Sequence, residues 1–333
     1  MPAFERSFVI ATRGSALALA QSSLILAQCR AAFPRNQFEI KVIKTTGDKL
    51  QTMALTNANH AVTKGLFTKE LEVALLKHTA DLAVHSLKDL PTELPPGLKL
   101  GAVTKRADVR DLLIYRNADF LAAQRADAGA KRGLPPQATI QEFPSGATIA
   151  TSSTRRQAQL LALRADLKLV PIRGNVGTRL QKLADQSELD GLVLAAAGFE
   201  RLGFQILASG EIHGKDIPAG LLAVYLSPEE MLPCVGQAAL GIEMRIDDPN
   251  TDAICATLND YPTQQCVTAE RAFLHGMGGG CLSPVAAYAD IHEGQLRLRA
   301  VSFREERVRR GEKRGAIQDA DQLGTELARE LRE

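Results

Sequence analysis

The stretch that decides the fold is residues 148–195, TIATSSTRRQAQLLALRADLKLVPIRGNVGTRLQKLADQSELDGLVLA. Short apolar runs alternate there with amphipathic segments, in the order 148–150, 155–163, 167–172, 176–184 and 191–195. Apolar runs of this length that alternate with helical patterns are typical of β-α-β units, whose parallel strands pair in one sheet. The stretch therefore predicts an α/β domain with a mainly parallel sheet.

The same rhythm opens the chain. Apolar or alternating runs at 8–12, 38–44 and 82–85 are expected to be strands, and the segments at 16–32 and 68–77 are expected to be helices. A second α/β domain with a mainly parallel sheet is therefore predicted before residue 104.

Two regions depart from this rhythm. Residues 117–146 are rich in Ala, Gly and Pro and lack periodicity, which predicts a surface insertion. After Asp260 the order becomes a helix, two strands, a basic stretch that ends at Gly315, and a last helix. The expected elements are 268–274, 285–290, 295–302 and 320–333. This order favours a small α+β domain with an antiparallel sheet.

Composition narrows the functional classes. The 333 residues suffice for two or three domains, and 40 Lys and Arg against 38 Asp and Glu leave a net charge of +2. Neither this charge nor the 5% aromatic content favours nucleic-acid binding. No run approaches the roughly 20 apolar residues of a membrane span. The first residues also lack a signal-peptide pattern, so no membrane partner is expected.

The five cysteines stand at 29, 234, 255, 266 and 281, and no two of them form a CxxC pair. The sequence therefore predicts free thiols in a reducing cytoplasm and no metal site. Three of these cysteines fall in helical patterns and are expected in the core, namely Cys29, Cys255 and Cys266.

Basic residues recur in Gly/Ser/Thr turns where a strand passes into a helix. The turns are Thr12–Ser15, Thr151–Arg156 and Arg173–Arg179. Two arginines in the first turn of a helix oppose the helix dipole, so their presence there favours a functional role over a merely solvated surface. Helix N-termini and arginine forks together bind carboxylates or phosphates. These turns predict an anion site at the carboxyl ends of the strands.

A polar cluster follows the expected strand at 82–85 and ends at Pro91. Within it, Asp89 is either an N-cap or ion-pair partner of Lys88, or a carboxylate in a cationic cleft. In a cationic cleft Asp89 stays ionised and stabilises positive charge that develops on a substrate.

The loop His275–Pro284 contains three consecutive glycines before Cys281. Because Cys-Leu-Ser follows these glycines, a Walker phosphate loop is excluded. Cys281 is either a core cysteine or a thiol presented for covalent chemistry. Two classes of protein stay open at this point: a two-lobed anion-binding protein without catalysis, and a cysteine hydrolase that pairs Cys281 with His275 or His85.

Taken in order, these segments resemble the porphobilinogen deaminase (hydroxymethylbilane synthase) family over nearly the whole chain. The matching segments are Ile10–Arg13, Lys64–Phe67, Val84–Pro91, Thr151–Gln157, Arg173–Arg179, Leu232–Gln237, Ala269–Arg271 and Gly279–Cys281. The chain departs from the family pattern at Val62-Thr63, where the family often has two glycines, and at His60, where it sometimes has a basic residue.

The resemblance implies a transferase of tetrapyrrole and haem biosynthesis. Such an enzyme joins four molecules of its substrate porphobilinogen head to tail, releases four ammonia molecules and frees hydroxymethylbilane by hydrolysis. A loop cysteine of the family carries a dipyrromethane cofactor through a thioether, and this role falls on Cys281. The aspartate that handles the pyrrole nitrogens and the cationic azafulvene intermediate falls on Asp89.

The resemblance also implies the binding residues. Cofactor contacts fall on Lys88, Thr151, Ser152, Ser153, Arg155, Arg156 and Arg173. Substrate contacts fall on Arg13, Ser15, Lys64, Ser86, Arg173, Arg179 and Gln237. Each pyrrole ring carries two carboxylates, so a growing chain is a polyanion. A protein of near-neutral charge holds such a chain by concentrating its arginines in one cleft.

The resemblance implies a protein of three domains that acts as a monomer. The first two resemble type II periplasmic binding proteins and comprise residues 1–104 with 239–256, and residues 105–238. The third, residues 257–333, is the α+β domain that bears the cysteine loop.

Overall fold

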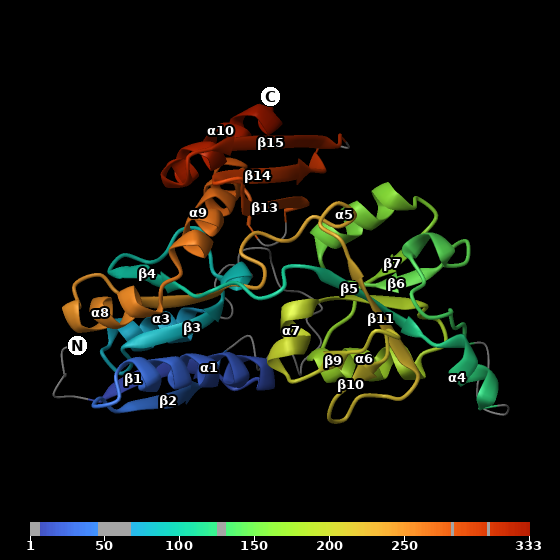
Figure 1. Cartoon of the computed structure of the whole chain (residues 1–333), viewed down its shortest axis with the longest axis horizontal. Helices are drawn as coiled ribbons and strands as arrows, with labels where there is room; N and C mark the ends of the chain where they lie inside the picture. Colours follow the sequence, from blue (N-terminus) through green and yellow to red (C-terminus); the bar gives the residue numbers. More distant parts are fainter. Residues whose placement is uncertain (1–6, 46–67, 125–130, 281–282, 305–306) are drawn as a thin grey trace.

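The computed structural model describes residues 7–45, 68–124, 131–280, 283–304 and 307–333. Two α/β regions lie side by side, and a smaller third region lies against both of them (Figure 1). Within the described ranges, none of the helices is long and apolar enough to cross a membrane.

The first sheet is built from both early and late segments of the chain. Its strand order is β2 (Phe38–Ile43), β1 (Phe8–Arg13), β3 (Leu82–Ser86), β12 (Leu240–Arg245) and β4 (Leu98–Val103). β1 is parallel to β2 and β3, whereas β12 is antiparallel to both of its neighbours. Alternate side chains of β1 point to opposite faces, so Ile10 packs with α1 and Ala11 packs with α3. The helices are α1 (Ala16–Ala32), α3 (Lys69–Leu76) and α8 (Pro249–Leu258).

The second sheet repeats this plan. Its strand order is β11 (Leu221–Leu226), β5 (Asp111–Arg116), β8 (Gly191–Ala195), β6 (Thr148–Ala150) and β7 (Lys168–Val170). β6 is parallel to β7 and β8, and β5 is the antiparallel strand. The helices are α4 (Ala118–Ala123), α5 (Thr154–Leu163), α6 (Val176–Asp185) and α7 (Ala196–Arg201), and a hairpin comprises β9 (Gln205–Ile206) and β10 (Ile212–His213).

The third region packs two helices on an antiparallel sheet. Its elements are α9 (Tyr261–Gly276), β13 (Val285–His292), β14 (Gln295–Ser302), β15 (Arg309–Gly315) and α10 (Ala320–Arg332). The helices approach closely at Gly324, where a Cβ atom would lie 2.2 Å from the carbonyl oxygen of Ala269.

This architecture confirms the expected fold class of two parallel-rich α/β sheets with a small antiparallel α+β region. Each large sheet contains one antiparallel strand, and the chain enters the second region before β5 and re-enters the first sheet at β12. The chain therefore crosses twice between the two α/β regions.

A buried carboxylate joins both crossings to the third region. Glu270, on α9, accepts hydrogen bonds from Nη1 and Nη2 of Arg106 at 2.6 and 2.9 Å. The same carboxylate accepts from the backbone N–H of Gly236 at 2.7 Å and of Ala289 at 2.9 Å. Because Arg106 precedes β5 and Gly236 precedes β12, this one side chain fixes the third region to both connecting segments.

One expectation for these regions was wrong, and one strand was not expected. Residues 117–146 are not wholly a surface insertion, because Ala138, Ile140 and Phe143 are buried in the core beneath α5. The basic stretch before Gly315 is the strand β15. Its inner face carries glycines and long cations in place of apolar residues, and Lys313 forms ion pairs with Glu326 and Glu330 on α10 at 3.2 and 2.8 Å. Because these inner positions are not apolar, the sequence lacks the alternation of apolar and polar residues that marks a half-buried strand.

Candidate anion-binding site

Two of the basic turns lie side by side at one edge of the second sheet. β6 and β7 are parallel neighbours, and the turns that follow them are joined through Ser152. Its hydroxyl donates to the backbone oxygen of Ile172 at 2.8 Å and accepts from the N–H of the same residue at 3.0 Å. Ser153 caps α5 and Asn175 caps α6, so both helices begin at this edge.

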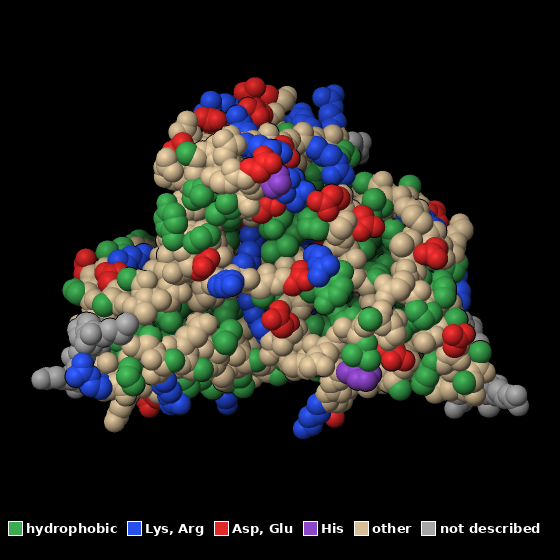
Figure 2. Space-filling view, viewed as in Figure 1, with side chains coloured by type: hydrophobic (Ala, Val, Ile, Leu, Met, Phe, Trp, Pro, Cys, Tyr) green, Lys and Arg blue, Asp and Glu red, His purple; other side chains and the backbone are tan. Residues whose placement is uncertain are grey.

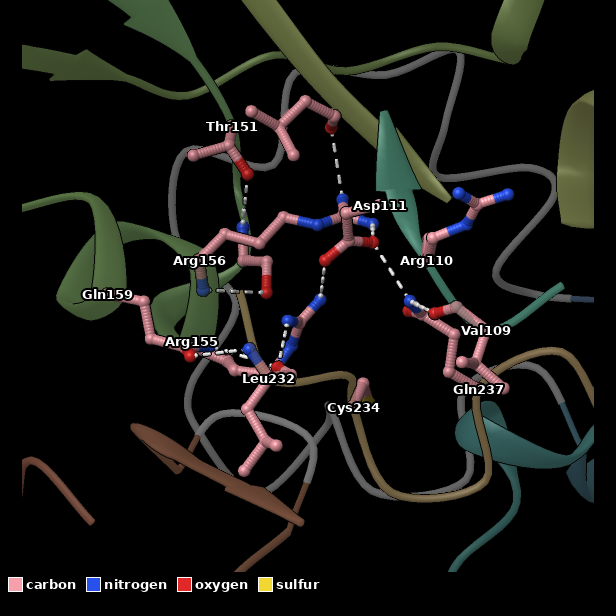
Figure 3. Close-up of polar contacts among 12 residues, drawn as sticks. Val109, Arg110, Asp111, Thr151, Arg155, Arg156, Gln159, Leu232, Cys234 and Gln237 are labelled. Atoms are coloured by element: carbon pink, nitrogen blue, oxygen red, sulfur yellow. Dashed lines mark hydrogen bonds and ion pairs between the residues drawn. The ribbon is translucent and has the colours of Figure 1, made fainter. Parts of the chain in front are cut away.

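Asp111 is the centre of a buried ionic network at the same edge (Figure 3). It begins β5, opposite the last residue of β8, and is 0% exposed. Its carboxylate accepts from Nη2 of Arg155 and of Arg156, each at 2.7 Å, and from Nε2 of Gln237 at 2.9 Å. Burial alone would raise the pKa of this carboxyl, but the two arginines hold it well below its usual range.

The two arginines are held by further contacts. Nη1 of Arg155 donates to the backbone oxygen of Leu232 at 2.7 Å, and Nη1 of Arg156 donates to that of Val193 at 3.0 Å. Their Nε atoms are buried and have no hydrogen-bond partner among the described residues. Two guanidinium charges against one carboxylate leave one positive charge in this network. The network therefore has an excess of positive charge and two N–H donors that the described residues do not use, which are features that favour binding of an anion.

Two more cations lie within electrostatic reach of Arg156. The pKa of Lys88 is lowered by burial and by the positive charge of Arg156, while Asp89 opposes the shift. The pKa of Arg179 is lowered by burial and again by Arg156, and its Nε donates to the backbone oxygen of Gly174 at 2.8 Å. We call Lys88, Arg155, Arg156 and Arg179 the cationic cluster. An anion that enters it relieves the repulsion among these four charges.

In the first sheet, β3 leads to Lys88 of the cluster, and β1, its parallel neighbour, ends at the same edge of the sheet. Ser15 caps α1 by accepting from the N–H of Ala18 at 3.3 Å, and Arg13 is the last residue of β1. The Ser86 hydroxyl accepts from Nε2 of Gln21 at 2.8 Å. A short 3-10 helix, Leu87–Asp89, follows, and Asp89 is exposed. On the face drawn in Figure 2, lysine and arginine side chains gather where the three regions meet.

The predicted site residues differ in their surroundings. Arg173 is exposed, whereas Thr151 is buried and its hydroxyl accepts from the N–H of Ser153 at 3.3 Å. Gln237 is 1% exposed, and its Nε2 donates to the backbone oxygen of Val109 at 2.7 Å as well as to Asp111. Cys281 and Lys64 lie outside the described residues.

Asp111 was missed by the sequence reasoning. A lone acidic residue at the start of the apolar run DLLIYR is the one signal that pointed to it, because an aspartate in such a buried strand needs a cationic partner. Those partners lie more than 40 residues later along the chain, at Arg155 and Arg156.

Among the described residues, His85 and three of the cysteines are buried in the core. His85 is buried and its Nε2 lies 3.0 Å from Oε2 of Glu243, so it is already engaged. Cys29, Cys255 and Cys266 are buried as expected, and burial raises the pKa of each thiol to about 12. Across the described ranges, no group of three or more His, Cys, Asp or Glu residues is arranged to hold a metal ion.

Family models match both parts of the chain. The model described as "Porphobilinogen deaminase, dipyromethane cofactor binding domain" matches residues 8–253, and the one described as "Porphobilinogen deaminase, C-terminal domain" matches residues 264–333.

Relatives named porphobilinogen deaminase are similar over nearly their full length. The protein of Syntrophus aciditrophicus is 43% identical over 97% of this chain and 94% of its own. The protein of Thermus thermophilus is 40% identical over 98% of this chain and 96% of its own. Among solved structures, the BenM effector binding domain with its effector benzoate aligns at 14% identity and a TM-score of 0.41, covering 77% of this chain and 91% of that one. That likeness is too weak to bear on function. The models and the relatives establish that the chain belongs to the porphobilinogen deaminase family, a family of transferases of tetrapyrrole biosynthesis.

Proposed function

We propose that the chain joins four porphobilinogens head to tail with loss of four ammonia molecules and releases hydroxymethylbilane by hydrolysis. It does so on a dipyrromethane cofactor that is attached through Cys281. Family membership supports the reaction, and the match to a dipyrromethane cofactor binding domain supports the cofactor. The observation that carries the proposal for this chain's own residues is the cationic cluster around Asp111.

The cluster fits the charge of the cofactor. A dipyrromethane has two rings and four carboxylates, and the cluster provides four cations against the single buried carboxylate of Asp111. The unpartnered Nε atoms of Arg155 and Arg156 supply donors that the protein itself does not use. When bound, the dipyrromethane supplies the pyrrole carbon to which porphobilinogen units are added. Lys88, Arg155, Arg156 and Arg173 would hold its carboxylates, with donors from Thr151, Ser152 and Ser153.

Asp89 has the surroundings that a charge-stabilising carboxylate needs. It is exposed and lies directly after Lys88, at the end of the strand that faces the cluster. Its carboxylate would accept the pyrrole N–H groups and balance positive charge that develops on the substrate. A negative charge does this best where it is already held in place, because no reorganisation is then needed at the moment of reaction.

Incoming porphobilinogen would be bound by residues around this centre. Arg13, Ser15 and Ser86 lie at the edge of the first sheet, and Arg173 and Arg179 lie on the neighbouring turn of the second. We include Lys64 and Gln237 in this set. The Oε1 atom of Gln237 is buried without a partner in the described structure, whereas its Nε2 is occupied by Asp111 and Val109.

The proposal also covers the domain organisation, the oligomeric state and the cellular location of the protein. We propose a monomer of three domains, residues 1–104 with 239–256, 105–238 and 257–333, that acts in the cytoplasm without nucleic-acid or membrane partners. The return of β12 to the first sheet supports this division, and so does the anchoring of the third region through Glu270. A monomer is proposed because the residues assigned to the site all belong to one polypeptide.

The intact mass of the denatured, purified protein tests the proposal. We expect a mass increase that equals one dipyrromethane, and we expect Cys281→Ser to lose both this increase and nearly all activity while it stays folded. Cys234→Ser is the matched control, because Cys234 is a half-buried thiol beside the cluster that is expected to leave the adduct intact. An unmodified parent chain, or an adduct that persists in Cys281→Ser, would refute the proposal.

A further inference from the structure

Arg271, on α9 of the third region, binds the backbone that directly follows Asp89. Its Nη2 donates to the backbone oxygen of Pro91 at 2.6 Å and to that of Thr92 at 3.2 Å. Its Nη1 donates to the backbone oxygen of Leu90 at 3.2 Å. Three consecutive carbonyl groups, the first of them in the residue next to Asp89, therefore accept hydrogen bonds from one guanidinium.

The main chain holds the start of this segment but not its end. The N–H of Leu87 donates to the backbone oxygen of Ala239 at 3.0 Å, and the N–H of Leu90 donates to that of Leu87 at 3.1 Å. Among the described residues, no backbone N–H donates to the carbonyl groups of residues 90–92. The turn that bears Asp89 is thus fixed by backbone bonds on one side and by Arg271 on the other.

One face of α9 lies along this segment. Val267, Arg271 and His275 follow one another at intervals of four residues, which places them on the same face of the helix. Val267 packs with Leu90 in a buried cluster, and Nδ1 of His275 lies 3.7 Å from Oε1 of Glu93 at the exposed end. Arg271 lies between these two contacts, and it is the residue of this face that binds the backbone of the segment.

Asp89 depends on such outside support. It is exposed and belongs to a 3-10 helix of three residues, which has few hydrogen bonds of its own. Pro91, two residues later, has no backbone N–H with which to hold the chain. The position of the Asp89 carboxylate is therefore set by the groups that anchor the residues on either side of it.

We propose that Arg271 is a positioning residue for Asp89. By binding the carbonyl groups of residues 90–92 against α9, it fixes where the Asp89 carboxylate lies beside the cationic cluster. Arg271 touches neither the substrate nor the cofactor in this role and acts through the backbone. The third region thereby sets the geometry of a group that the first region carries. The inference rests on the proposed function, because it presupposes that Asp89 balances charge on the substrate.

Steady-state kinetics of the loaded, full-length enzyme tests this role. We expect Arg271→Gln to lower kcat by on the order of tenfold to a hundredfold, the range that a small misplacement of a reacting group produces. The adduct should stay intact and KM should stay within about twofold of the parent value, because the binding residues are unchanged. Arg271→Lys keeps the charge but lacks the planar fork that reaches several acceptors, so we expect it to lose activity as well, by a smaller factor.

Arg309→Gln is the matched control. Arg309 is half-buried like Arg271, and its Nη1 donates to two backbone oxygens at the end of α10, those of Leu331 and Arg332, each at 3.1 Å. The change removes contacts of the same kind within the third region, far along the chain from Asp89. We expect its kcat to stay within about twofold of the parent value, whatever its Tm.

Two further measurements separate positioning from a general loss of stability. In the Asp89→Asn background, Arg271→Gln should lower the single-turnover rate by less than about twofold, because a residue that acts through a carboxylate has no further effect once that carboxylate is gone. Hydrogen exchange of the peptide that spans residues 87–94 should be faster in Arg271→Gln than in the parent and unchanged in Arg309→Gln.

Several results would overturn the inference. These are a parent kcat in loaded Arg271→Gln, an equal loss of kcat in Arg309→Gln, equal losses in the parent and Asp89→Asn backgrounds, or unchanged exchange at residues 87–94. If Arg271→Gln does not fold, Arg271→Lys carries the same measurements. A parent chain without the adduct, or a parent kcat in Asp89→Asn, refutes the proposed function and this inference together. A slow Asp89→Asn beside a fully active Arg271→Gln refutes this inference alone.

Discussion

Two buried networks of arginine and aspartate lie in corresponding sheets, and they differ in the sign of their charge. In the second sheet, Arg155 and Arg156 share the single carboxylate of Asp111. In the first sheet, Nη2 of Arg245 contacts two carboxylates, Asp81 at 3.0 Å and Asp248 at 2.6 Å. Counted over these contacts, the first network has two cations to one carboxylate, and the second has one cation to two carboxylates.

The two networks also lie at opposite ends of their strands. Arg245 ends β12, which runs antiparallel to β3, so it lies beside the start of β3 and away from Asp89. Its Nη1 donates to the backbone oxygens of Leu75 and Ala80 at 2.9 and 2.6 Å. Asp111, in contrast, lies at the carboxyl edge, where the helices begin. The comparison leads us to propose that the cation-rich network at the carboxyl edge binds an anion, whereas the closed network around Arg245, whose guanidinium donates to two carboxylates and two backbone oxygens, serves stability.

Arg245→Leu tests the closed network and has the largest expected effect. Removal of one partner from a buried ion pair leaves uncompensated charge and costs about 3–5 kcal/mol of unfolding free energy. Because Arg245 lies away from the cleft, the cofactor adduct and the kcat of the folded fraction should match the parent. Urea unfolding and intact mass measure these two quantities. Loss of the adduct from a folded variant would show that the two networks are not distinct in function.

Asp89→Asn tests the exposed carboxylate that directly follows Lys88 of the cationic cluster. The change is nearly isosteric but removes the charge, and loss of such electrostatic stabilisation costs on the order of 10²–10³ in rate. We expect kcat to fall by this factor with the adduct and Tm preserved. Steady-state kinetics on the loaded enzyme is the measurement. A rise in KM at unchanged kcat would rule out the charge-stabilising role.

Arg13→Leu and Arg173→Leu test whether cations outside the Asp111 network serve the incoming rings. Each change removes charge-assisted hydrogen bonds, which contribute about 1.5–3 kcal/mol each when desolvated. We expect both variants to keep the cofactor, which Lys88, Arg155 and Arg156 would still hold in Arg173→Leu. Both should stall during elongation, so that enzyme with added pyrroles accumulates after brief exposure to porphobilinogen. Native mass spectrometry resolves these species. A distribution identical to that of the parent would end the proposed division of labour.

The smallest expected effect is on the pH dependence of stability. The folded-state pKa of Asp111 lies below the unfolded value of about 3.9, so the stabilisation from its ionised form is complete above that value and declines as the pH falls toward the folded pKa. Asp111→Asn removes this contribution. The difference in Tm between the parent and Asp111→Asn should therefore be constant from pH 5 to 7 and narrow below about pH 4. Curves that stay parallel into acid would contradict the ionic account of this network.

Most of the fold could be predicted because its signals are local. The helix at 16–32 and the strand at 295–302 have the predicted bounds, since each is an unbroken periodic pattern. β15 could not be predicted, because its inner positions carry Arg309, Gly311, Lys313 and Gly315. Their role becomes visible only when α10 packs over them, where Leu327 fills the space above Gly311.

The candidate site was predictable in part for the same reason. The turn at Thr151–Arg156 breaks a local rule of helix dipoles and so marks itself in the sequence. Asp111 is marked only by its position at the start of an apolar run, because its partnership with Arg155 and Arg156 depends on β5 running antiparallel to β8. Long-range pairing of this kind is decided by topology rather than by any local pattern.

The central claim is that the Asp111 network holds the cofactor, whereas the Arg245 network only stabilises the fold. We test it by comparing the cofactor content of two variants, Arg156→Leu and Arg245→Leu. Both changes delete one arginine from a buried network, so both should lower the free energy of unfolding. Intact mass of the folded protein should show Arg156→Leu largely without the dipyrromethane adduct, Arg155→Leu affected less, and Arg245→Leu fully loaded. An Arg156→Leu protein that carries the adduct at the parent level would contradict the claim.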